Sequence, residues 1–305
     1  MNQNNRKLTA LTVLLTAALA TGLPAFAAES PDPPVRTDPP PVGRIASAPV
    51  QTLPGVDGGS IVVRDILGPG DFETSLSHVR LFVLPKGSRI DFTDDRTCDR
   101  IMLARAGTVS IVADSASHTL ATGGMLSCPR GTTVAVANDT VESARLLIIE
   151  SDDRDSPSPA PQPGSEPSVI ELSLTREAMA LSSGAHDGRG ELLFRRLLNP
   201  KAFATRMWVV SHAVLLPGAT IGYHFHATRE EVYFVLDGAG RVVGNGHVYD
   251  LGAGDCAVCS PGSAHGIANI GSGELELLVF SASQLKGVVT GEQNLGDDLG
   301  RLLER

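Results

Sequence analysis

Two histidines separated by a single residue, His224 and His226, are the feature of this sequence most suited to metal chemistry. Side chains two residues apart on a β-strand point to the same face, so these imidazoles would form a chelating edge. A carboxylate and a third histidine would complete a site for a borderline divalent metal. Two glutamates, Glu230 and Glu231, follow in the same segment, and His265 lies in a second segment, 260–269.

The segments that would position these residues carry strand and turn signals. Residues 232–236 are apolar or aromatic and meet an Asp-Gly pair, 241–249 predict a hairpin through Asn245-Gly246, and 275–280 predict a further strand. The 32 glycines, 20 prolines and only 4% aromatic residues favour short strands and turns over long packed helices. These signals together predict an all-β sandwich or barrel.

Two apolar, glycine-punctuated blocks, 43–150 and 169–285, share a common register. Identical residues recur 131 positions apart in the two blocks: Gly87 and Gly218, Gly107 and Gly238, Cys128 and Cys259, Gly131 and Gly262, Asn138 and Asn269. Glycines in turns hold backbone conformations that a side chain would disfavour, so their shared spacing indicates an internal duplication. The sequence therefore predicts two tandem domains of one design.

The second block resembles the cupin superfamily, whose first motif is G-x5-H-x-H-x3–4-E-x6-G and whose second is G-x5-P-x-G-x2-H-x3-N. The first motif is matched by Gly218, His224, His226, Glu231 and Gly238. The second is matched by Gly254, Gly262, His265 and Asn269, with Ser260 where the family has proline. The resemblance implies an all-β protein of two tandem jelly-roll barrels, with a metal in the mouth of the second.

The same resemblance implies the ligand set, which is His224, His226, Glu231 and His265. Glu230 is the alternative carboxylate, because a three-residue spacer is also allowed in the motif. We prefer Glu231 because six residues then separate it from Gly238. The expected cofactor is one divalent transition metal, with manganese or iron favoured over nickel or zinc.

Tyr233 lies two residues beyond Glu231 and shares its inward parity on the expected strand. We therefore consider Glu231 and Tyr233 together as candidate catalytic residues, with core packing as the alternative role of Tyr233. Arg229 lies between the expected ligands, where it would either meet an anionic substrate or, as we favour, be solvated. His212 is expected to be structural and His247 to be exposed.

The first block keeps the glycine framework of the motifs but not their ligands. Thr93 and Asp95 stand at the two histidine positions, Arg100 at the glutamate position and Val134 at the second-motif histidine position. These residues cannot hold a transition metal, so we expect a site in the second barrel alone. Arg100 and Asp95 would either bind a polar or anionic ligand or form an internal ion pair, which we favour.

The segments outside the two blocks have their own signals. Residues 1–28 predict a Sec-type signal peptide, with Arg6 and Lys7 before an uncharged apolar run and Ala25-Phe26-Ala27 as the cleavage site. Residues 29–42 are proline-rich and expected to be disordered, 151–168 form a Pro/Ser-rich linker, and 286–305 form a tail. We expect a secreted protein with no membrane association after cleavage.

The net charge of −9 argues against a nucleic-acid partner. A small molecule is the expected partner, and a homodimer stays open. Export permits disulfides. Cys256 and Cys259 would face opposite sides of a strand and could not pair, whereas a Cys98–Cys128 bridge stays open.

Cupin-like folds support several reactions, so the fold does not decide the function. Four protein ligands leave an octahedral metal about two open positions, where a substrate with adjacent oxygens could chelate. We expect a secreted, metal-binding bicupin that acts on a small oxygenated substrate as a dioxygenase, an oxidase or a decarboxylase-like enzyme. The alternatives are a cupin that binds metal or ligand without turnover and a cupin of the isomerase or lyase type.

Overall fold

The computed structural model describes residues 36–54, 60–92, 95–153 and 167–296. The chain divides into two units, Met1–Asp32 and Pro33–Arg305, and all described residues belong to the second. The expected signal peptide and most of the expected linker therefore lie outside the described residues. Within these ranges, no helix is both long enough and apolar enough to cross a membrane.

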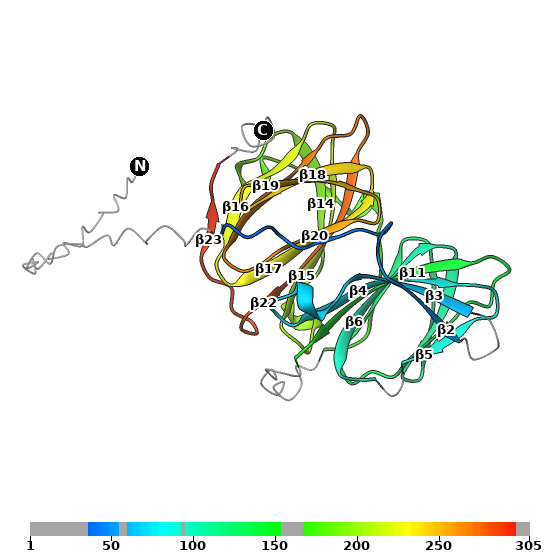
Figure 1. The fold of residues 1–305 in the computed structure, drawn as a ribbon. Helices are drawn as coiled ribbons and strands as arrows, with labels where there is room; N and C mark the ends of the chain where they lie inside the picture. Colours follow the sequence, from blue (N-terminus) through cyan, green and yellow to red (C-terminus); the bar gives the residue numbers. More distant parts are fainter. Residues whose placement is uncertain (1–35, 55–59, 93–94, 154–166, 297–305) are drawn as a thin grey trace, which may run out of the picture. The chain divides into compact units, whose positions relative to one another are not determined.

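The described chain forms two tandem jelly-roll β-barrels, as the sequence predicts (Figure 1). The strands of the first are β2 (Val50–Pro54), β3 (Ser60–Leu67), β4 (Leu76–Leu84), β5 (Arg89–Asp91), β6 (Cys98–Ala106), β7 (Thr108–Ala113), β8 (Ala116–Ala121), β9 (Gly124–Cys128), β10 (Val134–Ala137), β11 (Ala144–Asp152) and β12 (Ile170–Ser173). They form a seven-stranded sheet, β12-β9-β6-β11-β4-β3-β2, and a four-stranded sheet, β5-β10-β7-β8.

The second barrel has the same plan. Its strands are β1 (Val42–Gly43), β13 (Ala180–Ser183), β14 (Glu191–Leu198), β15 (Met207–Leu215), β16 (Thr220–His226), β17 (Arg229–Asp237), β18 (Ala239–Gly244), β19 (His247–Gly252), β20 (Cys256–Cys259), β21 (Ser263–Asn269), β22 (Leu275–Ser283) and β23 (Glu292–Asn294). The sheets run β1-β20-β17-β22-β15-β14-β13 and β19-β18-β21-β16-β23. The described helical turns are four short 3-10 segments: η1 (Pro69–Asp71), η2 (Arg176–Ala178), η3 (Ala185–Asp187) and η4 (Pro200–Ala202).

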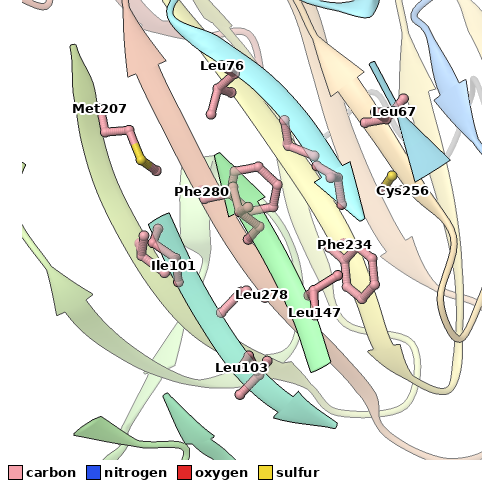
Figure 2. Packing of buried hydrophobic residues seen from close by; sticks show 14 of the residues in the cluster. Leu67, Leu76, Ile101, Leu103, Leu147, Met207, Phe234, Cys256, Leu278 and Phe280 are labelled. Atoms are coloured by element: carbon pink, nitrogen blue, oxygen red, sulfur yellow. The ribbon is translucent and has the colours of Figure 1, made fainter. Parts of the chain in front are cut away.

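The largest hydrophobic cluster lies between the two barrels. Figure 2 shows Leu67, Leu76, Ile101, Leu103 and Leu147 of the first barrel against Met207, Phe234, Cys256, Leu278 and Phe280 of the second. Separate clusters fill the interior of each barrel. Strands such as β17 are therefore buried on both faces, and an alternating polar pattern is missing from their sequence.

The duplication extends to hydrogen bonds across this interface. The Asp99 carboxylate of the first barrel accepts hydrogen bonds from the Ala204 amide (3.1 Å) and from the Thr205 amide (2.8 Å) and hydroxyl (2.6 Å). Glu230, which lies 131 residues after Asp99, accepts from the Glu73 amide (2.9 Å) and the Thr74 hydroxyl (2.5 Å). The barrels thus hold each other through a reciprocal pair of carboxylates.

Two short segments next to the expected domain boundaries pair with the other barrel. Strand β1 pairs with β20 of the second barrel, and β12, which follows the linker, pairs with β9 of the first. Residues 36–41, the described end of the segment expected to be disordered, run along the second barrel. There the Val258 amide donates to the Pro41 carbonyl, and Asn245 donates to the Asp38 carbonyl.

All four cysteines lie within the described residues, and all are buried free thiols. The Cys98–Cys128 bridge that the sequence left open is therefore not formed. Cys128 lies opposite Arg100 in the β6–β9 pairing, two residues away from Cys98. Cys256 contributes to the interface and Cys259 to the interior of the second barrel, so they face opposite sides of β20 as predicted.

Replacing Asp99 by alanine is expected to weaken the interface. The change leaves the Ala204 and Thr205 amides without their acceptor at a buried position. Unsatisfied buried donors of this kind should lower the free energy of unfolding by about 2–4 kcal/mol, measured by urea denaturation. Asp139→Ala, at an exposed position, is the matched control. Equal stability of the two variants would show that the Asp99 contacts do not hold the barrels together.

Candidate metal centre

The expected ligands come from three strands and both sheets of the second barrel. His224 and His226 lie on β16, and His265 lies directly opposite His224 on the paired strand β21. Glu231 lies on β17, in the other sheet. The four side chains are buried, and one ligand atom of each lies within 4.8 Å of the others. The barrel therefore brings together all four residues of the predicted ligand set.

Backbone contacts orient two of the imidazoles. The Nδ1 atoms of His224 and His265 lie 2.8 and 3.0 Å from the carbonyl oxygens of Gly222 and Ser263, which accept hydrogen bonds from them. This leaves each Nε2 with a lone pair that faces Glu231, at 3.7 Å from His224 and 3.6 Å from His265. Within the described residues neither buried Nε2 has a hydrogen-bond partner. Such orphaned acceptors fit a divalent metal, which requires neutral imidazoles.

The electrostatics also suit a cation. Burial lowers the pKa of His224 and of His226, so both imidazoles are neutral at pH 7. Burial alone would raise the pKa of Glu231. The nearby Arg229 guanidinium opposes burial and contributes to a pKa well below the ordinary value. The donor set is therefore neutral nitrogen with one carboxylate, which suits manganese, iron, nickel or zinc.

Arg229 is part of this centre, which corrects the sequence-based preference for a solvated side chain. The residue is only 9% exposed, and its guanidinium contacts His226 Nε2. Its Nη2 also lies 3.6 Å from the Glu231 carboxylate and 3.2 Å from that of Glu292. Because two cations repel, a metal at His226 Nε2 requires the guanidinium to withdraw from that nitrogen.

His186 is a fourth histidine at the centre and was not predicted. Its ring, on η3, stacks on that of His224 with centroids 3.8 Å apart, and its Nδ1 lies 3.0 Å from Asn294 Oδ1. The approach depends on Gly222, because a Cβ there would lie 2.1 Å from the His186 carbonyl oxygen. No motif spacing links His186 to the ligands, and only the flanking glycines, Gly184 and Gly188, mark its loop.

A cavity of about 240 Å³ reaches the centre, where Glu231, Arg229 and His186 line it. Its walls include apolar side chains such as Leu192, Val209 and Ile221, and its cations are Arg196 and Arg229. Pockets for drug-sized ligands measure roughly 300–1,000 Å³, so this cavity suits a smaller molecule. The combination of apolar walls and guanidinium groups favours a small anion.

Tyr233 lines the cavity and also packs in the barrel interior. Its buried hydroxyl has no hydrogen-bond partner among the described residues. Burial raises the pKa of Tyr233 far above its ordinary value, and the Glu231 carboxylate adds to that shift, so the hydroxyl stays protonated. The tyrosine can therefore both pack and offer a proton to a ligand.

Three other residues named by the sequence lie away from the centre. Glu230, the alternative ligand, points to the opposite face of β17 and is bonded to the first barrel, because neighbouring strand residues alternate faces. Burial raises the pKa of Glu230 to about 7. His212 is buried with its Nε2 2.6 Å from the Glu276 carboxylate, which suits the expected structural role. His247 Nε2 lies 2.9 Å from the Thr37 carbonyl oxygen.

Comparison with known proteins identifies the family. The model of the cupin domain matches residues 211–281, the segment that carries the four ligands. The oxalate-binding protein of Thermotoga maritima is 32% identical over 96 residues, which are 32% of this chain and 79% of that protein. This chain belongs to the cupin family. An uncharacterized protein of Methanocaldococcus jannaschii is 29% identical over 89 residues, which are 29% of this cupin and 71% of that protein.

Solved structures share the fold of both barrels. A putative glyoxylate-induced protein from Pseudomonas aeruginosa superimposes with a TM-score of 0.61 at 17% identity, over 79% of this chain and 86% of that one. Oxalate decarboxylase from Lactobacillus farciminis, solved with formate, has a TM-score of 0.58 at 15% identity, over 83% and 88% of the two chains. At these identities the likeness supports the tandem arrangement of a bicupin, not a shared activity.

The first barrel of this bicupin carries an ion pair where the second carries the metal ligands. Arg100, which corresponds to Glu231, is 1% exposed, and its guanidinium lies 2.6 Å from Asp95 and 2.8 Å from Glu150. The predicted pairing of Arg100 with Asp95 is thus confirmed. Thr93 lies outside the described residues, and Val134 is part of the apolar core. A buried guanidinium therefore stands in the first barrel at the position that corresponds to Glu231.

Proposed function

We propose that this cupin binds one divalent transition metal in its second barrel and uses it to convert a small oxygenated anion, in an oxidase, dioxygenase or decarboxylase-like reaction. The observation that carries the proposal is the position of a buried guanidinium, Arg229, beside the cluster of three histidines and one glutamate. A metal and a guanidinium at one end of a small cavity can bind two oxygens of the same anion.

His224, His226, Glu231 and His265 would hold the metal. Manganese or iron would supply Lewis-acid and redox chemistry, and nickel or zinc would supply Lewis acidity for an isomerase or lyase reaction. Arg229 would orient the substrate by a charge-assisted hydrogen bond to its carboxylate. Tyr233 would offer its hydroxyl proton to the substrate, while the apolar wall of the cavity excludes water from the reacting atoms.

The second candidate is a cupin that captures metal and anion without turnover. The observation that favours it is the relative from Thermotoga maritima, whose name describes binding and of which the chain covers 79%. In both cases the ligand that we propose is a small carboxylate anion whose adjacent oxygens can chelate a metal, such as oxalate. The expected signal peptide further suggests that either role is performed outside the cell.

Oxalate is the probe that tests the proposal. The protein should be purified without a histidine tag, analysed for metals, and titrated with oxalate by calorimetry after loading with manganese. We expect about one equivalent of metal and saturable oxalate binding. Turnover would appear either as formate with carbon dioxide or, with oxygen consumed, as carbon dioxide with hydrogen peroxide. Binding without any of these products favours the capture protein, and the absence of both metal and oxalate binding would refute the proposed function.

A further inference from the structure

Strand β23, in the tail to which the sequence assigned no role, lies beside the strand that carries two of the ligands (Figure 1). It pairs with β16 so that Glu292 lies opposite His226 and Asn294 lies opposite His224. The Leu295 amide donates to the Tyr223 carbonyl at 2.8 Å, and the Ala227 amide donates to the Gly291 carbonyl at 3.1 Å. These backbone bonds hold the strand at the edge of the metal centre.

The side chain of Glu292 reaches the guanidinium that we assign to the anion. Its Oε1 lies 3.2 Å from Arg229 Nη2 and 3.4 Å from His226 Nδ1. The same Nη2 lies 3.6 Å from Glu231, the expected metal ligand. Glu231 is buried on β17, and as the expected metal ligand it would balance the charge of the metal. Glu292 is therefore the carboxylate that balances the charge of Arg229 when no substrate is present.

The Glu292 side chain can move away from Arg229 more easily than the Glu231 side chain can. The Glu292 side chain is 50% exposed, whereas that of Glu231 is 9% exposed. A half-exposed carboxylate can turn into water at little cost, because exposed ion pairs contribute little to stability. The backbone of β23 need not move, since its bonds to β16 do not involve the Glu292 side chain.

We propose that Glu292 occupies the anion-binding position of Arg229 in the ligand-free protein, so that a substrate carboxylate binds by displacing it. This inference rests on the proposed function, because it requires an anionic ligand at Arg229. The exchange replaces one carboxylate by another on the same guanidinium, with no bond made or broken. Glu292 thereby selects for anionic ligands, because a neutral molecule cannot replace its carboxylate on Arg229.

An internal competitor lowers the apparent affinity in proportion to the fraction of time that it occupies the site. Removing it from Arg229 should therefore tighten oxalate binding by about 2–5-fold, the range expected for a partly exposed ion pair. Two variants remove it in different ways. Glu292→Gln removes the charge, and Glu292→Asp keeps the charge on a side chain too short to reach Arg229 in the same way.

The experiment is calorimetric titration of the manganese-loaded full chain with oxalate, for wild type, Glu292→Gln and Glu292→Asp. Displacement predicts that both variants bind oxalate more tightly than wild type. A gain in Glu292→Gln alone would show only a general effect of charge and overturn the proposal, as would weaker binding in both variants. Glu274→Gln, which alters an exposed partner of Arg176, is the remote control and should match wild type.

Failure of the inference and failure of the proposed function give different results. Oxalate that binds wild type and both variants equally would overturn displacement by Glu292 and leave the proposed function standing. Oxalate that binds none of the three would overturn both. Binding that appears only in the two variants would support displacement most strongly. Thermal melting of each variant confirms that it is folded, since substitution at an exposed strand position should change stability little.

Discussion

Replacement of both His224 and His226 by alanine is expected to abolish metal binding by this cupin. The double substitution removes two of the four ligands and leaves His265 and Glu231, which lie on different sheets and cannot enclose a metal alone. Loss of a residue that merely orients a ligand costs about 10–100-fold in metal affinity, so loss of two ligands should cost more than about 100-fold. Elemental analysis should fall from about one equivalent to background.

The control for this experiment is His118→Ala/His247→Ala, which removes two histidines outside the cluster. It should keep the metal content of the wild type and exclude adventitious binding to histidines outside the cluster. Metal retained equally in both double variants would show that the cluster on β16, β17 and β21 is not the metal site. The four residues would then have only a structural role, and the binding of an anion by Arg229 would have to be tested without metal.

Arg229→Met is expected to separate anion binding from metal binding. The methionine keeps much of the apolar stem but removes the guanidinium, so oxalate loses one charge-assisted hydrogen bond. Such a bond contributes about 1.5–3 kcal/mol, which corresponds to a loss of about 10–100-fold in affinity. Metal affinity should stay the same or increase, because the guanidinium that contacts His226 Nε2 competes with a cation for that nitrogen.

The opposite directions of the two effects make this variant informative. Calorimetry with oxalate and titration with manganese on the same preparation report them separately. Arg145→Met, an exposed arginine of the first barrel, is the matched control and should change neither. A loss of metal together with oxalate would mean that Arg229 supports the fold of the centre. Unchanged oxalate binding would place the anion elsewhere in the cavity.

The first barrel contributes to the centre through packing and not through ligands. Glu230, next to the expected ligand Glu231, is held by the Glu73 amide and the Thr74 hydroxyl of the first barrel. This contact fixes the start of β17 and therefore the side chain that follows it. The first barrel itself fills the equivalent position with the Arg100–Asp95–Glu150 ion pairs.

The sequence by itself determined the parts of this protein that depend on local spacing. His224 and His226 share a face because strand side chains alternate, and the same alternation separates Cys256 from Cys259. The glycine register predicted two domains of one design, because turns that require an unusual backbone conformation recur at one interval. The two motifs placed Glu231 and His265 with them, and the structure brings all four together.

Only the tertiary structure decided which other groups meet these ligands. The strand pattern sends Glu230 and Glu231 to opposite faces, but the packing of the barrels determined that Glu230 bonds to the first one. Arg229 is buried, His186 stacks on His224, and Glu292 reaches Arg229. His186 and Glu292 lie 38 and 66 residues from their partners, His224 and His226, in irregular or edge segments. Their positions depend on how these segments pack against the barrel, and this packing leaves no periodic pattern in the sequence.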